Sequence, residues 1–288
     1  MDPRLNEPSA KKILQGLGIK PLKFFGQSFL QELSVLKAPF EFLELSPQKS
    51  ILEIGAGVGN VTRRILKEGP RVIALEVDHR FIPVLNQLKE EFPGFDFQIK
   101  DALSLSWDAL FNGEPYSIFG NIPYNITGPL LEKMLLREKK WERGVLLLQE
   151  EVSRRLLAPP GEKEYSSLTL FARFKARIKK GPRVSRKCFF PVPKVDSAFI
   201  FLERKLEPDF PVIDEGFLLG LIRGTFQERR KTLSNNLLRI FPSLSRFELE
   251  ELQSQVGFSF KRRSETLSLE EFSKLANILT SRKQDAKL

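Results

Sequence analysis

The feature that most constrains the fold of this chain is a glycine-rich turn that joins a short apolar strand to a helix. Residues 51–54 predict the strand, Gly55-Ala56-Gly57-Val58-Gly59-Asn60 forms the turn, and residues 61–66 predict the helix. A second apolar strand, residues 72–75, ends at Glu76, about 20 residues after the first glycine. Glycine allows a tight turn and lets a ligand approach the backbone at a helix N-terminus. The pattern predicts an α/β fold whose ligand lies at the carboxyl ends of parallel strands.

Two cofactors fit this layout. A dinucleotide would favour the spacing G-x-G-x-x-G, but Asn60 stands at the third glycine position and the glycine comes one residue earlier, at Gly59. The observed pattern E-x-G-x-G-x-G suits S-adenosylmethionine, which has a ribose and an adenine but no pyrophosphate. Glu76 would then accept hydrogen bonds from both ribose hydroxyls. Turns of this kind also occur in proteins without any ligand.

A second motif, Asn121-Ile122-Pro123-Tyr124, follows an apolar strand at residues 116–119 and precedes a helix that starts near Thr127. Asn121 offers a side-chain carbonyl as acceptor, and Pro123 contributes an acceptor but no donor. Tyr124 offers a flat face. Two acceptors beside an aromatic ring suit a planar base with an exocyclic amino group. The simpler interpretation is a strand end with a proline turn, against which Tyr124 packs.

Charge and composition narrow the function classes. The net charge of +10 in 288 residues favours a polyanionic partner, and most of the excess falls in residues 1–206. With one cysteine and one histidine, the chain can form no internal disulfide, and we expect no metal site. No apolar run is long enough for a membrane span, and the N-terminus lacks a signal-peptide core, so we expect a cytoplasmic protein.

A basic stretch from Arg173 to Lys187 contains no acidic residue. Within it Lys175, Arg177 and Lys179 alternate with apolar or small residues, a period of two that predicts a strand with its cations on one face. We interpret that face as a phosphate-binding surface. The alternative is a solvated edge strand protected by charge.

Three further segments carry candidate residues. Asp101 follows a third strand, residues 95–99, and either accepts from an adenine amino group or caps a turn. Phe189 begins the stiff loop of residues 189–197, which could hold a ring against a base. Residues 207–288 show helical stripes and two basic clusters, Arg229-Arg230-Lys231 and Lys261-Arg262-Arg263, which are either helix-end charges or RNA contacts.

The chain resembles the KsgA-type ribosomal RNA adenine dimethyltransferases, which share their fold with the erythromycin-resistance RNA methylases. The resemblance covers almost the whole chain. It is carried by these motifs: Gly26-Gln27-Ser28-Phe29-Leu30, Glu53 to Gly59, Leu75-Glu76-Val77-Asp78, Asp101-Ala102, the Asn121 motif, Phe189-x-Pro-x-Pro-Lys-Val-Asp-Ser, and Gln227-x-Arg229-Arg230-Lys231-Thr232. Ser28 stands where the family usually has His or Asn, and Ile122 replaces the commoner Leu.

Residues 1–24 are predicted to form a basic N-terminal arm. The resemblance implies an α/β fold with a Rossmann-like, seven-stranded class I methyltransferase sheet in residues 1–206 and a small helical domain in residues 207–288. It implies S-adenosylmethionine as cofactor and a ribosomal RNA substrate within a pre-ribosomal or 30S particle. We expect a monomer. The residues implied are as follows: around the cofactor Ser28, Leu30, Gly55, Gly57, Glu76, Asp101 and Asn121; at the reacting base Asn121, Ile122, Pro123, Tyr124 and Phe189; on RNA Lys175, Arg177, Lys179, Arg229, Arg230 and Lys231.

The implied product is N6,N6-dimethyladenosine at two adjacent adenosines near the 3′ end of small-subunit RNA. Three alternatives remain open. A resistance-type methylase would act on large-subunit RNA. A DNA N6-adenine methylase usually carries a target-recognition domain, which residues 207–288 do not suggest. A non-catalytic RNA-binding relative would be expected to lose the Asn121 motif or Glu76, and this chain keeps both.

Overall fold

The computed structural model describes residues 8–285, so residues 1–7 of the predicted basic N-terminal arm and the last three residues of the predicted helical domain lie outside the described residues. The chain divides into two compact units. The first contains the residues up to Ser153 together with Arg177–Arg204. The second contains Arg154–Ala176 together with the residues from Lys205 onward.

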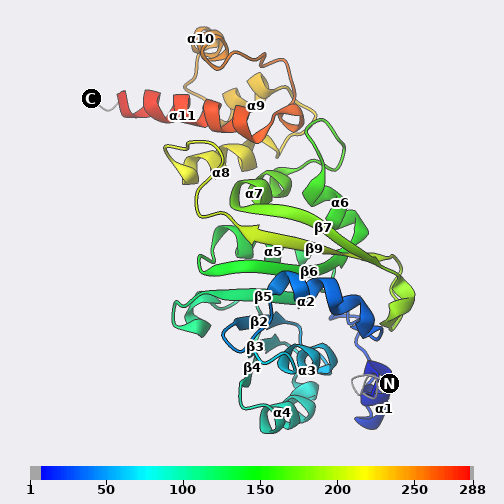
Figure 1. Ribbon diagram of the computed structural model, residues 1–288. Coiled ribbons are helices and arrows are strands. Elements are labelled where there is room, and N and C mark those ends of the chain that lie inside the picture. The colour runs from blue at the N-terminus through cyan, green and yellow to red at the C-terminus, as the bar shows by residue number, and fades with distance from the viewer. Residues whose placement is uncertain (1–7, 286–288) are drawn as a thin grey trace. The chain divides into compact units, whose positions relative to one another are not determined.

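A seven-stranded sheet forms the centre of the first unit, as the resemblance implies, with the strand order β4-β3-β2-β5-β6-β9-β7 (Figure 1). Its strands are β2 (Ser50–Ile54), β3 (Arg71–Glu76), β4 (Phe95–Ile99), β5 (Tyr116–Asn121), β6 (Trp141–Gln149), β7 (Ala176–Val184) and β9 (Ser197–Arg204). The pairs β2–β3, β3–β4, β2–β5 and β5–β6 are parallel, and β9 pairs antiparallel with β6. The central strands are nearly continuous buried apolar runs because helices cover both faces of the sheet.

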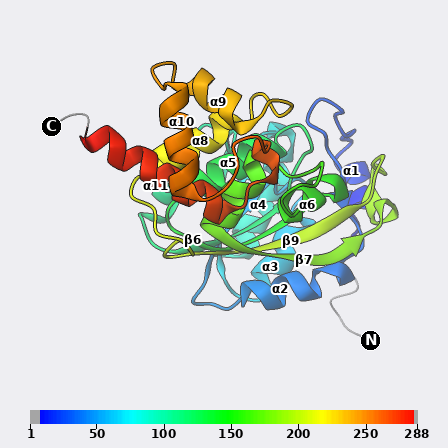
Figure 2. The same ribbon diagram turned by 90° about the horizontal axis from the view of Figure 1, so that it is seen from above.

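The helices of this unit are α1 (Ala10–Gly16), α2 (Lys37–Leu43), α3 (Asn60–Leu66), α4 (Ile82–Glu91), α5 (Thr127–Leu136) and α6 (Glu150–Leu157), the last of which continues into the second unit. Figure 2 shows α2 and α5 on opposite faces of the sheet. No helix within residues 8–285 combines the length and the apolar character needed to cross a membrane.

The strand order reverses between β2 and β5, since the chain proceeds outward through β3 and β4 on one side and through β6 on the other. Such a reversal separates the connecting loops at the carboxyl ends of the two strands and leaves a crevice there, where open α/β sheets bind ligands. The glycine-rich turn follows β2, and Asn121 ends β5. The topology thus brings the two main sequence motifs to one place.

A small second sheet closes this end of the first unit. β1 (Phe29–Leu30) pairs antiparallel with β8 (Phe189–Phe190), so that Leu30 lies opposite Phe189. The pairing joins the loop before β1 to the proline-rich loop after β8, although about 160 residues separate them in sequence. Neither segment shows a strand-like pattern long enough to predict this pairing.

The second unit is helical, with α7 (Ser167–Lys175), α8 (Glu215–Thr225), α9 (Leu233–Ile240), α10 (Arg246–Val256) and α11 (Leu269–Asp285). Side-chain caps begin several of its helices, and a left-handed glycine, Gly257, ends α10. Residues 154–176 belong to this unit, whereas the predicted division at residue 206 groups them with the sheet. They pack there because Tyr165 donates a hydrogen bond to the Leu267 carbonyl and Gly161 N–H donates to the Glu265 carbonyl.

Candidate active site

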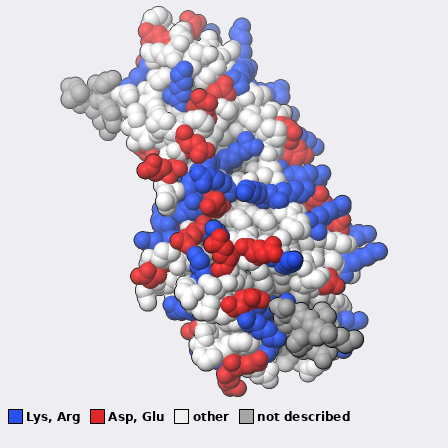
Figure 3. Space-filling view, viewed as in Figure 1, with Lys and Arg blue, Asp and Glu red and all other residues white. Residues whose placement is uncertain are grey.

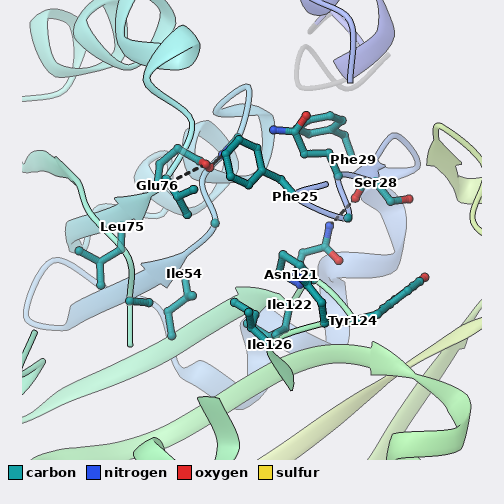
Figure 4. A pocket seen from close by; sticks show the side chains of 18 of the residues that line it. Phe25, Ser28, Phe29, Ile54, Leu75, Glu76, Asn121, Ile122, Tyr124 and Ile126 are labelled. Atoms are coloured by element: carbon teal, nitrogen blue, oxygen red, sulfur yellow. Dashed lines mark hydrogen bonds between the residues drawn. The ribbon is translucent and has the colours of Figure 1, made fainter. Parts of the chain in front are cut away.

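The carboxyl ends of β2, β3, β4 and β5 open into a cavity of about 320 Å³. Its remaining wall comes from residues 24–29, which precede or begin β1, and from Phe189 of β8. Figure 4 shows Glu76 and Asn121 on different sides of this cavity, with the ring of Phe25 directed toward Glu76. The cavity is within the range of small-molecule sites, and most of its wall is apolar.

The glycine turn forms the floor on one side. Gly55 and Gly57 have φ of +82° and +55°, values that favour glycine. A Cβ at Gly57 would lie 2.7 Å from a ring carbon of Phe29, so a side chain there would displace the wall. Gly59, with φ of +71°, starts α3 and faces Leu88 instead of the cavity.

Glu76, at the end of β3, is buried and held by backbone N–H groups. Its Oε2 accepts from Gly57 N–H at 2.7 Å, and its Oε1 accepts from Val77 and Asp78 N–H at 2.8 and 2.9 Å. Burial raises the pKa of the carboxyl, and these three hydrogen bonds oppose the rise. A carboxylate has about four acceptor positions, so one position on Oε2 is left for a ligand hydroxyl, and not the two that the sequence predicts for both ribose hydroxyls.

Glu53, one strand away on β2, is also buried and does not line the cavity. Burial raises the pKa of its carboxyl to about 7, the nearby Thr62 side chain opposes the rise, and the charge of Glu76 adds to it. Its Oε2 has no hydrogen-bond partner among the described residues. Two buried carboxyls therefore lie on neighbouring strands, and only that of Glu76 lines the cavity.

Asp101 follows β4 and lines the cavity. Its Oδ1 accepts from Leu103 N–H at 2.8 Å, so it does cap a turn. Because Asp101 also lines the cavity, its second carboxylate oxygen is available to a ligand. Asp101 can therefore cap the turn and accept from an adenine amino group at the same time.

Asn121 ends β5, and its side-chain amide has a fixed orientation. Nδ2 donates to the Ser28 carbonyl at 2.8 Å, which leaves Oδ1 as an acceptor at the cavity (Figure 4). The Pro123 carbonyl accepts from Ile126 N–H at 3.2 Å and from the Thr127 hydroxyl at 3.1 Å. Because the start of α5 uses the Pro123 carbonyl in this way, the prediction that Pro123 supplies the second acceptor is wrong. The Ile122 carbonyl is the alternative within the same motif.

The two predicted aromatic residues differ in accessibility. Tyr124 is half-buried, lines the cavity and makes a side-chain hydrogen bond with Ser197. Phe189 also lines the cavity but is only 2% exposed, because it packs in the core. Tyr124 therefore offers the larger face to a base.

The two residues predicted from the loop before β1 have different positions. Ser28 lines the cavity, but its hydroxyl donates to the Pro191 carbonyl at 2.9 Å. The side chain of Leu30 is buried in the core and is not part of the cavity wall, while its carbonyl accepts from Asn60 Nδ2. Phe25 and Gln27 also line the cavity, although neither is among the predicted site residues. The only signal for them is the aromatic and glycine-containing loop that carries them.

The prediction that Lys175, Arg177 and Lys179 lie on one strand is partly wrong. Lys175 ends α7 instead of lying on a strand, and its Nζ pairs with Glu215 at 2.5 Å in the second unit. The helix extends to this residue because a Ser166 capping box starts it and Leu170, Phe171 and Phe174 are buried at helical spacing. Arg177 and Lys179 do lie on β7 and are exposed. Figure 3 shows basic side chains gathered along the band where β7 lies.

The three residues of the predicted basic cluster Arg229-Arg230-Lys231, in the second unit, differ in their contacts. Arg229 pairs with Glu265 at 2.8 Å and donates to the Lys163 carbonyl, so it stabilises the unit internally. Arg230 and Lys231 are exposed.

Comparisons with known proteins agree with this geometry. Residues 19–281 match the model of the family described as ribosomal RNA adenine dimethylase. The ribosomal RNA small subunit methyltransferase A of Bacillus cytotoxicus is 36% identical over 282 residues, which are 95% of this chain and 96% of that protein.

Two solved structures are similar over most of the chain. A dimethyladenosine transferase from Plasmodium falciparum has a TM-score of 0.70 and 25% identity, covering 89% of this chain and 98% of that one. The 23S rRNA methyltransferase ErmE has a TM-score of 0.66 and 26% identity, and the similarity covers 88% of this chain and 99% of that one. The sheet, the site motifs and these relatives agree: the chain is a methyltransferase that belongs to the ribosomal RNA adenine dimethylase family.

Proposed function

We propose that this protein transfers methyl groups from S-adenosylmethionine to the N6 amines of two adjacent adenosines near the 3′ end of small-subunit ribosomal RNA, forming N6,N6-dimethyladenosines. It acts as a monomer in the cytoplasm, on RNA within a pre-ribosomal or 30S particle, and so contributes to small-subunit biogenesis. The observation that carries the proposal is the fixed amide of Asn121, whose Nδ2 donates to the Ser28 carbonyl and whose Oδ1 remains an acceptor at the cavity.

The cavity has the features that S-adenosylmethionine requires. Gly55 and Gly57 supply backbone without side chains, and Glu76 presents one acceptor position to a ribose hydroxyl. The apolar wall at Ile54 and Leu75 suits an adenine ring, and Asp101 offers a carboxylate oxygen to its amino group. When bound, this cofactor supplies a methyl group activated by a positively charged sulfur.

Asn121 would act on the base that receives the methyl group. The exocyclic amine of adenine is a weak nucleophile because its lone pair is delocalised into the ring. When Asn121 Oδ1 and the Ile122 carbonyl accept its two hydrogens, the pyramidal, nucleophilic form of the nitrogen is favoured. The motif contains no histidine, aspartate or lysine that could take a proton, so positioning is its main contribution.

The reacting adenosine must leave its stack to enter the cavity, at a cost of a few kcal/mol. Stacking on an aromatic ring contributes about 1–3 kcal/mol per base and offsets much of that cost. Tyr124 is half-buried, and its hydroxyl is held by Ser197, so its ring is placed before the base arrives. Phe189 closes the wall beside it.

Phosphate contacts would supply most of the RNA affinity. Arg177 and Lys179 on β7, and Arg230 and Lys231 in the second unit, are the exposed cations that we assign to this role. The net charge of +10 supports a polyanionic partner.

The choice of RNA is tested by offering purified protein two substrates with labelled S-adenosylmethionine: small-subunit particles that lack the modification, and protein-free large-subunit RNA. We expect label only in the small-subunit RNA, near its 3′ end. Label in the large-subunit RNA alone would assign the protein to the resistance-type activity. The absence of transfer to both would support a non-catalytic RNA-binding role.

A further inference from the structure

The side chain of Gln27 connects the loop before β1 to the segment that follows β3, and both segments contribute residues to the cavity wall. Its Oε1 accepts from Leu22 N–H at 2.8 Å within the loop before β1. Its Nε2 donates to Asp78 Oδ2 at 2.7 Å, two residues after Glu76. Gln27 therefore fixes the loop internally and attaches it to the end of β3 with a single amide.

Asp78 is a firm attachment point because it is buried and charged. Its side chain is 1% exposed, and Arg80 donates to both of its oxygens, at 2.8 and 2.5 Å. Burial would raise the pKa of Asp78, but the hydrogen bonds from Arg80 and Gln27 outweigh this effect and lower it. Arg80 also donates to the Lys20 carbonyl at 3.1 Å, so the same group holds the beginning of the loop.

The residue after Gln27 makes the contact that orients Asn121. The Ser28 carbonyl accepts from Asn121 Nδ2, and the Ser28 hydroxyl donates to the Pro191 carbonyl. If the Ser28 carbonyl moved away, the amide of Asn121 could rotate and direct its N–H groups at the incoming amine, which also donates. The acceptor role of Asn121 thus depends on where the backbone of residue 28 is held.

We propose that Gln27 is a positioning residue for methyl transfer: by joining Leu22 to Asp78 it fixes the Ser28 carbonyl, and that carbonyl keeps Asn121 Oδ1 directed at the reacting amine. This inference rests on the proposed function, because it assigns Gln27 an effect through Asn121. Asp78 and Arg80 complete the connection from the β3 side.

The test compares single-turnover methyl transfer at saturating S-adenosylmethionine and small-subunit particle for the wild type, Gln27→Ala, Asn121→Ala and the double variant. We expect Gln27→Ala to be slower by about 10- to 100-fold, the size of effect that a displaced reactive group produces. In the Asn121→Ala background the same change should cause no further loss, because the group that Gln27 positions is already absent.

Two other variants separate the donor from the bulk of the side chain. Gln27→Glu keeps the size but replaces the N–H donor with an oxygen that faces Asp78, so it should be as slow as Gln27→Ala. Gln31→Ala removes the same kind of side chain just after β1. Among residues 8–285, the Gln31 side chain makes one hydrogen bond, in which its Oε1 accepts from Lys11 N–H at 3.3 Å. It should transfer at the wild-type rate.

A second readout needs neither cofactor nor activity. Trypsin can cleave after Lys23, which lies in the loop that Gln27 holds, whereas Pro21 prevents cleavage after Lys20. Without cofactor, cleavage there should be several-fold faster in Gln27→Ala and Gln27→Glu than in the wild type and Gln31→Ala, while cleavage elsewhere stays the same. Equal cleavage in all four proteins would refute the attachment of the loop by Gln27.

The outcomes distinguish this inference from the function on which it rests. If Asn121→Ala transfers methyl groups at the wild-type rate, the proposed function fails. If Asn121→Ala is slow and Gln27→Ala is not, only the positioning role fails. If the double variant is slower than Asn121→Ala by the full factor of Gln27→Ala, Gln27 acts independently of Asn121 and the inference is also refuted.

Discussion

Replacing Glu76 with glutamine should weaken S-adenosylmethionine binding in a measurable and predictable way. Alanine is the less informative change at this position, because it would leave the N–H groups of Gly57, Val77 and Asp78 without their acceptor. Glutamine can keep one oxygen toward Val77 and Asp78 and places its NH2 group at the site of Oε2. The ligand hydroxyl then loses a charged acceptor.

The magnitude follows from the one acceptor position that the three backbone bonds leave on the carboxylate. A hydrogen bond to a charged group contributes about 1.5–3 kcal/mol, which corresponds to a dissociation constant about 10- to 150-fold higher in Glu76→Gln. The lost bond from Gly57 N–H should also lower the free energy of unfolding, by about 1–3 kcal/mol.

Calorimetric titration with S-adenosylmethionine measures the affinity, and thermal unfolding monitors the fold. The matched control is Glu68→Gln, an exposed carboxylate just after α3, which should change neither quantity. Unchanged affinity in a folded Glu76→Gln protein would refute the assignment of Glu76 to the ribose.

Three further predictions concern other parts of the chain. For the double variant Arg177→Ala/Lys179→Ala, the slope of log binding constant for RNA against log salt concentration should be shallower by about 0.7–0.9 per lost phosphate contact. An unchanged slope would support the alternative that β7 is a solvated edge strand protected by charge. Tyr124→Ala should reduce the fluorescence gain of a 2-aminopurine at the target position, whereas Tyr124→Phe, which keeps the ring, should not; equal losses in both would contradict stacking. The pKa of Glu53 rises from 4.5 in the unfolded chain to about 7 on folding. Below pH 4.5 the carboxyl is protonated in both states and does not change the free energy of unfolding; between pH 4.5 and pH 7 the unfolded chain alone releases the proton, so the folded state becomes less stable as the pH rises. At about 1.4 kcal/mol per pKa unit, this loss of stability amounts to about 3 kcal/mol in the wild type. Glu53→Gln should not show it, and chemical denaturation at several pH values would detect the difference.

The sequence predicts the sheet well because its central strands are buried on both faces. Runs such as residues 51–54 and 72–75 have few polar residues, and glycine or acidic residues mark their ends. The position of Asn121 and Glu76 at strand ends follows from the same runs. What the sequence cannot show directly is that the turn and the motif meet at the reversal of strand order.

Short sequence patterns give wrong predictions for residues whose conformation and partners depend on tertiary contacts. Lys175 fits the alternation of a strand, but the buried apolar face of α7 and the pairing with Glu215 place it at a helix end. Arg229 resembles its basic neighbours in sequence, yet Glu265 neutralises it. The Pro123 carbonyl fits the role of acceptor in the sequence, but Ile126 N–H and the Thr127 hydroxyl at the start of α5 already donate to it.

The hydrogen bonds of Gln27 cannot be predicted from local sequence patterns, for a different reason. A glutamine in a loop has no periodic signal, and its partner Asp78 is 51 residues away. The same holds for the pairing of β1 with β8, which brings Ser28 to the proline-rich loop. Such contacts come from the folded chain as a whole.

The most direct test of the central claim is to identify the product itself. Purified protein would be incubated with unmodified small-subunit particles and S-adenosylmethionine, and the RNA near the 3′ end would be digested and analysed by mass spectrometry, with Asn121→Ala as the matched control. We predict two adjacent N6,N6-dimethyladenosines with the wild type, and transfer about 10²–10³-fold slower with Asn121→Ala. Unmodified adenosines after incubation with the wild type, or equal modification by both proteins, would contradict the account.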